Sequence, residues 1–306
     1  MALQTRILAL AALLAVSSMS ASAAASDDLV IPFQFSRSGH IATSIVIDGD
    51  VEATAVIDTG ANFPMIGADA AAAAGIIAPE DASQIAVLGM GGIEDRPLIE
   101  VGQLEIAGIL FEAMPAALQT RNRFPGPPNV LPVTAFEGRT VDFDFQRKHI
   151  SLYDGPPRRV RDRRSKLELR TIEGIYFAKV QLNRRTGWAM IDTGSNITYV
   201  NSAFADAAGG RRQEQNLELT GVTDGEETAR TLRVRRLGLG RHGVEDFEVL
   251  VADPPIFEHL GLSAEPAMIL GLDALVGFRV QIDRQRRQLV LSVPENEQGR
   301  SVYRRN

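Results

Sequence analysis

The chain has 306 residues, 45% of them hydrophobic and 23% charged, which is the balance of a soluble globular protein with room for two domains. Its 32 basic and 38 acidic residues give a net charge of −6, which excludes the strongly basic surface of a nucleic-acid-binding protein. The absence of cysteine excludes disulfides, thiolate metal sites and cysteine nucleophiles, and the four scattered histidines argue against a histidine-rich metal site. We therefore expect no metal and no cofactor, and carboxylates remain as the groups able to carry chemistry.

Residues 1–25 predict a signal peptide. One positive residue, Arg6, precedes the apolar run Ile7–Val16, and small residues then suit a cleavage between Ala23 and Ser26. The alternative, a retained membrane anchor, would need a run of about 20 apolar residues. We therefore expect an exported protein, periplasmic or secreted, with no stable membrane anchor after cleavage.

The first predicted domain, residues 26–155, shows the period-two alternation of β-strands. Apolar residues alternate on both sides of an Asp-Gly-Asp turn at positions 48–50, which predicts a hairpin. A second hairpin is expected over residues 141–152. Short helices are expected only over residues 68–74 and, in the second half of the chain, 202–208, where a glycine follows each.

A basic segment, residues 156–166, separates the two halves of the chain. Two prolines and six basic residues leave it without an apolar face, which predicts a solvated linker; the alternative is a docking patch for anionic partners. At the end of the chain, residues 294–306 form a polar tail to which we assign no function.

The second predicted domain, residues 167–293, repeats the first. Ile175–Gly194 aligns without a gap with Ile41–Gly60, and both segments end in Ile-Asp-Thr-Gly. Residues 270–292 align in the same way with residues 131–153. Duplication of one unit is the simplest explanation, and it predicts an all-β protein with two similar lobes.

The repeat places one Asp-Thr-Gly sequence at equivalent points of the two domains, at Asp58 and at Asp192. Each copy follows an apolar strand. An aspartate can also cap a turn after a strand, but Asn or Ser would then serve as well, and Thr-Gly would not need to follow twice. Asp58 and Asp192 are therefore the candidate catalytic residues.

These motifs, their apolar lead-ins and the triplet Ile269-Leu270-Gly271 make the sequence resemble the aspartic proteases. The resemblance is to the bacterial retropepsin-like proteins, here with two lobes fused in one chain as in pepsin, and it covers roughly residues 30–155 and 167–293. It implies an acid-protease fold in which two pseudo-symmetric β-barrel-like lobes enclose a cleft and share one aspartate pair. It also implies a polypeptide substrate, and we expect a monomer that is a pseudo-dimer of its lobes.

The chemistry of such a pair explains the residue types. Two adjacent carboxylates cannot both ionise, so they share a proton and titrate together. The ionised member can activate a water as general base, while the protonated member hydrogen-bonds the scissile carbonyl. We expect the hydroxyls of Thr59 and Thr193 to lock the two loops together, and Gly60 and Gly194 to let backbone N–H groups approach the carboxylates.

The residues that follow the motifs differ, with Ala61 in the first copy and Ser195 in the second. In the aspartic proteases, which the sequence resembles, a hydroxyl at this position hydrogen-bonds the aspartate and favours its charged form. We therefore expect Asp192 to ionise more easily and Asp58 to hold the shared proton.

Glycine-rich sequences predict two hairpin tips, and the first resembles the flap that closes over the substrate of retropepsins. The alternative is an ordinary glycine-rich turn. The candidate flap and substrate-binding residues are Gly89, Met90, Gly91 and Gly92 in the first tip and Gly221 and Val222 in the second.

One departure from the family pattern concerns the first lobe, where Pro132 stands at the position of Gly271. Proline has no N–H and a fixed φ, so we expect a displaced loop or an imperfectly held Asp58. The sequence predicts an exported aspartic endopeptidase. The alternative is an inactive peptide- or protein-binding module of the same fold, which Pro132 favours; a carboxylate-pair glycosidase would have no reason to place its acids in symmetric repeats.

Overall fold

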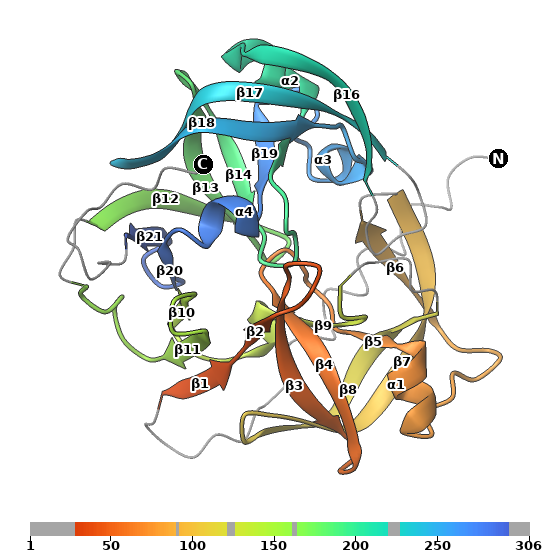
Figure 1. Ribbon diagram of the computed structural model, residues 1–306. Helices are drawn as coiled ribbons and strands as arrows, with labels where there is room; N and C mark the ends of the chain where they lie inside the picture. The colour runs from red at the N-terminus through yellow and green to blue at the C-terminus, as the bar shows by residue number, and fades with distance from the viewer. Residues whose placement is uncertain (1–27, 90–91, 121–125, 161–163, 220–226, 294–306) are drawn as a thin grey trace.

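The computed structural model describes residues 28–89, 92–120, 126–160, 164–219 and 227–293 (Figure 1). The predicted signal peptide and tail lie outside these ranges, as do Met90, Gly91, Gly221 and Val222 of the predicted hairpin tips. Strands make up most of the regular structure of the described residues, which confirms the all-β prediction. They form two sheets, one of 8 strands and one of 13.

The smaller sheet belongs to the first half of the chain. Its strands, in their spatial order, are β2 (Gln34–Phe35), β3 (Ile41–Ile47), β4 (Val51–Asp58), β9 (Asn129–Pro132), β5 (Met65–Gly67), β8 (Ile109–Gln119), β7 (Gly92–Ile106) and β6 (Gln84–Gly89). β3 also pairs with β7, so the sheet closes on itself. The predicted hairpin is β3–β4, and Asp48 and Gly49 of its turn both have positive φ, which explains the Asp-Gly sequence there.

The second half of the chain builds the same arrangement within the larger sheet. Its strands are β12 (Arg164–Ile172), β13 (Ile175–Leu182), β14 (Arg185–Ile191), β19 (Ala267–Leu270), β15 (Tyr199–Val200), β18 (His242–Val251), β17 (Glu227–Leu239) and β16 (Arg211–Leu219). β14 pairs in parallel with β19 just as β4 pairs with β9, and β15 pairs in parallel with β18 as β5 does with β8. The two lobes therefore repeat each other in topology as well as in sequence.

Short helices occupy the connections between strands. The predicted helices are α1 (Ala68–Ala73) and α2 (Ser202–Ala208), and the glycine after each, Gly75 or Gly209, has positive φ. Two further short helices, α3 (Pro255–His259) and α4 (Leu272–Leu275), and a single 3-10 turn (Val133–Ala135) were not expected.

A six-stranded part of the larger sheet joins the two lobes. Its strands are β1 (Leu29–Pro32), β11 (His149–Tyr153), β10 (Thr140–Asp144), β20 (Arg279–Asp283), β21 (Gln288–Ser292) and β12. β10 of the first lobe lies antiparallel to β20 of the second, so hydrogen bonds of one sheet cross the boundary between the lobes. β12 starts at Arg164, so the last three residues of the expected linker pair with β21.

Ion pairs reinforce this joint. Arg279 makes two hydrogen bonds of 2.8 Å to the buried carboxylate of Asp142, and Arg139 bonds Asp283 in the same two-pronged way at 3.0 and 3.1 Å. Gln281 also donates to Asp142 at 3.0 Å. Each arginine reaches across the pairing of β10 with β20, so the lobes are held together by charges as well as by the strand ladder.

Candidate active site

The two aspartates occupy equivalent places. Asp58 is the last residue of β4, and Asp192 comes directly after β14. The N–H of Gly60 donates to Asp58 at 2.6 Å, and the N–H groups of Gly194 and Ser195 donate to Asp192 at 2.9 and 3.0 Å. Each carboxyl group is thus oriented by the tight turn of its own motif.

The threonines of the two motifs bind the loops to each other. The Thr59 hydroxyl donates to the carbonyl of Ile191 at 2.7 Å, and the Thr193 hydroxyl donates to the carbonyl of Ile57 at 2.7 Å. Each hydroxyl also accepts the other threonine's N–H, at 3.0 and 3.1 Å. Both threonines are fully buried. These four reciprocal bonds form the lock between the lobes that the sequence led us to expect.

The glycines bring the two carboxyl groups together. A Cβ at Gly60 would lie 2.7 Å from Cγ of Asp192, and a Cβ at Gly194 would lie 2.5 Å from Cγ of Asp58. Each glycine therefore faces the carboxylate of the opposite lobe, where only a hydrogen atom fits. The two carboxyl groups share a hydrogen bond, so they form a pair.

The electrostatics of the pair differ from the expectation. Burial raises the pKa of both carboxyl groups, and the charge of Asp58 helps to raise the pKa of Asp192 well above its usual range. Asp58 accepts N–H groups from Gly60, Gly194 and Ala61 and a hydrogen bond from Asp192, and all of these favour its ionised form. These surroundings favour the proton on Asp192, whereas the residues after the motifs led us to expect it on Asp58.

The reason lies in the residues that follow the motifs. The Ser195 hydroxyl donates to the carbonyl of Ile197 at 2.8 Å, within its own loop, and gives Asp192 no bond beyond that of its backbone N–H. Ala61, which has no hydroxyl, still offers its N–H to Asp58. The hydroxyl on which the expectation depended therefore does not contact the carboxylate that it was expected to ionise.

Pro132 does not displace the first loop. Asp58 pairs with Pro132 in the β4–β9 ladder, and its bond from Gly60 is intact. In the second lobe the N–H of Gly271 donates to the hydroxyl of Thr198 at 3.0 Å. The repeat puts a proline, Pro64, at the position of that threonine. The first lobe has therefore lost the donor and the acceptor of the same bond, and the expectation of an imperfectly held Asp58 was wrong.

The predicted flap forms a hairpin between β6 and β7, with Gly89 paired to Gly92 on either side of its tip. Leu88, next to the tip, packs against an apolar cluster of the second lobe that includes Met190, Ile269 and Phe257 of α3. Figure 1 shows β6 reaching toward α3. The hairpin therefore rests against the opposite lobe, where β6 and β7 both contact α3.

In the described part of the chain, no three acidic or histidine side chains are grouped closely enough to hold a metal ion. The described residues also include no helix with the length and apolar composition required to cross a membrane. The carboxyl pair is the chemically distinctive feature at the junction of the lobes.

Comparison with protein families agrees with this geometry. A family model described as aspartyl protease matches residues 43–131 and 178–274, one segment in each lobe. The chain belongs to the aspartyl protease family. Each matched segment of this aspartyl protease contains one Asp-Thr-Gly sequence and reaches its partner strand, β9 or β19, so the resemblance inferred from the motifs is confirmed. A search of curated proteins finds no match to the chain. Membership implies a hydrolase that acts on polypeptides.

Proposed function

We propose that this protein is an endopeptidase in which Asp58 and Asp192 activate one water molecule. The observation that carries the proposal is the pair of hydrogen-bonded carboxyl groups, one from each lobe, fixed by the reciprocal threonine bonds. A pair that holds one proton between its two apparent pKa values can act as a base and as an acid in the same step.

The roles follow from the surroundings of each carboxyl group. The Asp58 carboxylate takes a proton from the water as the water oxygen bonds to the scissile carbonyl carbon. The proton on Asp192 passes to the carbonyl oxygen, which gives a tetrahedral diol. Breakdown of the diol then cleaves the C–N bond: Asp58 gives its proton to the leaving nitrogen, and a diol hydroxyl returns a proton to Asp192, which restores the singly protonated pair.

The decisive experiment is digestion of a complex peptide mixture by residues 26–306, analysed by mass spectrometry between about pH 3.5 and 7.5. Asp58→Asn and Asp192→Asn should each abolish cleavage, while the exposed Asp69→Asn should cut as the wild type does. Cuts that persist unchanged in either dyad variant would refute the shared-carboxylate mechanism.

The same experiment separates the enzyme from a binding module of the same fold. A peptide that mimics the tetrahedral state, such as a statine peptide, should bind the wild type and block its cleavage. Binding without cleavage of any peptide would identify the binding module. Pro132, the feature that favoured that alternative, is matched by Pro64 and gives it no support.

Export is a second element of the proposal. It rests on Arg6 and the apolar run Ile7–Val16, followed by small residues. N-terminal sequencing of the protein recovered from outside the cytoplasm should give a chain starting between Ala24 and Ser26. A chain that keeps Met1 in the cytoplasmic fraction would contradict it.

A further inference from the structure

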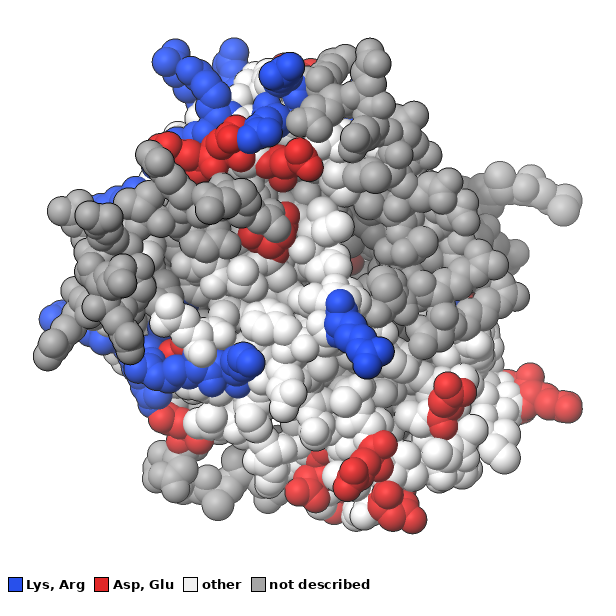
Figure 2. Space-filling model, in the orientation of Figure 1, with Lys and Arg blue, Asp and Glu red and all other residues white. Residues whose placement is uncertain are grey.

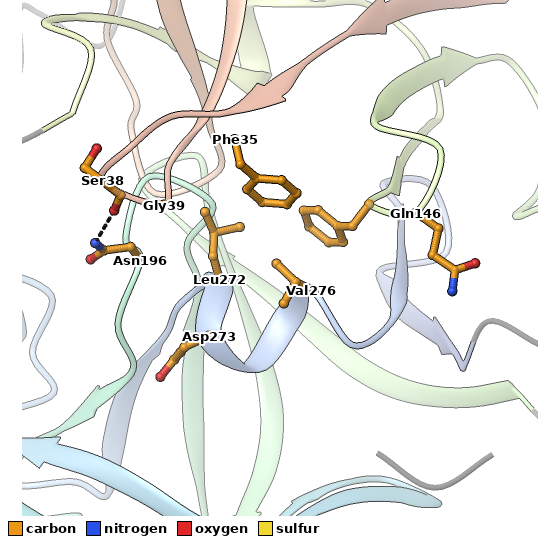
Figure 3. Close-up of a pocket in the computed structure, with 9 residues that line it drawn as sticks. Phe35, Ser38, Gly39, Gln146, Asn196, Leu272, Asp273 and Val276 are labelled. Atoms are coloured by element: carbon orange, nitrogen blue, oxygen red, sulfur yellow. Dashed lines mark hydrogen bonds between the residues drawn. The ribbon is translucent and has the colours of Figure 1, made fainter. Parts of the chain in front are cut away.

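A second feature at the junction of the lobes is a pocket of about 410 Å³ (Figure 3). Clefts of about 300–1,000 Å³ are the usual size for small-molecule binding sites. Its walls come from both halves of the chain: the loop between β2 and β3, the turn after β10, the loop after Asp192, and α4. The aspartate pair itself does not line it.

The pocket is physically continuous with the catalytic loop. Asn196, four residues after Asp192, lines the pocket and donates to the carbonyl of Ser38 on the opposite wall at 2.8 Å. The N–H of Leu272, another lining residue, donates to the carbonyl of Ser195 at 2.8 Å. Four residues span at most about 14 Å, so the pocket wall lies within the reach of about four residues of an extended peptide held at the pair.

The lining favours an aromatic occupant. In Figure 3 the side chains of Phe35, Leu272 and Val276 point toward one another, whereas Gln146 and Asp273 turn away from them. Phe35 is 40% exposed, which is unusual for a phenylalanine, and it is one end of an edge-to-face series in which Phe33 lies 5.7 Å from Phe35 and 6.0 Å from Phe145. Another ring entering the pocket would extend this series and cover the exposed face of Phe35.

The charge of the lining disfavours an acidic occupant. The pocket has no lysine or arginine in its lining, and its one ionisable group is the carboxylate of Asp273, which accepts the Thr198 hydroxyl at 2.5 Å. An acidic side chain would lose its hydration there without gaining a cationic partner. A short aliphatic side chain would cover less of the exposed Phe35 ring and could not extend the edge-to-face series.

We propose that this pocket is a secondary substrate subsite that holds an aromatic side chain within about four residues of the scissile bond. The inference rests on the proposed peptidase function. It predicts that the protein prefers substrates with Phe, Tyr or Trp at a single position two to four residues from the cleaved bond. This preference adds to any selectivity for the two residues that flank the bond.

The test uses peptide pairs that share one cleavage site and differ by Phe or Ala at each position from two to four residues away on either side. At one of these positions, the wild type should cleave the Phe peptide with a kcat/KM about tenfold higher than that for the matching Ala peptide. Phe35→Ala should reduce this preference to about twofold, and Phe35→Tyr should keep it. Val276→Phe, which adds a ring to the pocket lining and so takes up part of the space, should also remove it.

The matched control is Ile77→Ala, which truncates a side chain that is 84% exposed and does not line the pocket. This variant should keep the full preference. No preference at any position in the wild type, or a preference unchanged in both Phe35→Ala and Val276→Phe, would overturn the subsite.

A binding measurement separates failure of the subsite from failure of the peptidase proposal. The same peptides are titrated into Asp192→Asn by calorimetry, where no cleavage is needed. Tighter binding of the Phe peptide, lost in the double variant Asp192→Asn/Phe35→Ala, supports the pocket even if the wild type cleaves nothing. Equal affinities of the Phe and Ala peptides at every position would refute the pocket even if the wild type is an active protease.

Discussion

At the scale of single residues, the two carboxyl groups differ although the sequences around them are nearly the same. The difference comes from the number of donors: three backbone N–H groups and the partner's proton for Asp58, against two backbone N–H groups for Asp192. Apart from the proton of Asp192, these donors are backbone N–H groups, which the sequence does not mark. The division of roles between base and acid is therefore set by backbone geometry.

The pH dependence of Ser195→Ala tests this view. Because the Ser195 hydroxyl donates to Ile197 and not to Asp192, its removal should leave both limbs of the kcat/KM profile in place. Activity falls at low pH as Asp58 gains a proton and at high pH as Asp192 loses its own. The raised pKa values place both limbs above those of ordinary carboxyl groups. If the acid limb of the profile shifts in Ser195→Ala, the Ser195 hydroxyl does affect the pKa values of the pair, and this prediction is wrong.

Gly194→Ala tests how closely the pair is packed. The added methyl group would press on Asp58, so the carboxyl groups must separate, and we expect a loss of at least about 100-fold in kcat/KM. Gly155→Ala is the matched control, since its Cβ would lie 3.6 Å from the Tyr153 ring, an ordinary contact. Nearly wild-type activity of Gly194→Ala would show that the approach of the two loops is looser than described.

At the scale of elements, the hairpin of β10 and β11 shows where sequence patterns mislead. Its Val-Asp-Phe-Asp-Phe alternation is typical of a strand with one solvated face, yet all five residues of β10 are buried. The aspartates can be buried because each forms an ion pair with an arginine. Asp142 pairs with Arg279 of the other lobe, and Asp144 pairs with Arg147. A period-two pattern reveals the strand but not whether another strand covers its polar face.

Arg279→Met should therefore destabilise the protein strongly. It would leave the carboxylate of Asp142, which is 1% exposed, without its cation, at a cost of about 3–5 kcal/mol in the free energy of unfolding. Arg147→Met removes an arginine that is 72% exposed and should cost less than about 1 kcal/mol. Urea unfolding measures both. Similar values for the two variants would show that the joint between the lobes does not depend on this ion pair.

At the scale of the whole molecule, charge is distributed unevenly. On the face shown in Figure 2, basic and acidic side chains lie side by side at the top, over β17 and β18, whereas acidic ones gather at the bottom, over the lobe of β3 and β4. Part of the basic charge is paired locally, as in Arg233 with Asp246 and Arg236 with Glu245. The net charge of −6 conveys none of this separation.

The free energy of unfolding should depend on the cost of ionising the buried carboxyl pair. Asp192 has a higher pKa in the folded state than in the unfolded chain, so the folded state binds its proton more tightly. The free energy of unfolding therefore decreases as the pH rises from the unfolded pKa through the folded pKa. Asp192→Asn removes the penalty, so it should stabilise the protein by about 1–2 kcal/mol at neutral pH and by less near pH 4. Urea unfolding at both pH values, with Asp69→Asn as control, checks the sign; destabilisation at neutral pH would contradict it.

The sequence by itself determined the duplication, the all-β class, the two Asp-Thr-Gly motifs, the hairpins at residues 45–57 and 141–152 and the first two helices. These features depend on local periodicity and on the repeat, which a linear sequence displays directly. Tertiary structure decided which carboxyl group holds the proton, how Pro64 and Pro132 compensate each other, how the lobes share a sheet, and where the apolar pocket lies. Each of these depends on atoms brought together from distant segments, and their free energies come from backbone donors, burial and ion pairs that have no sequence signature of their own.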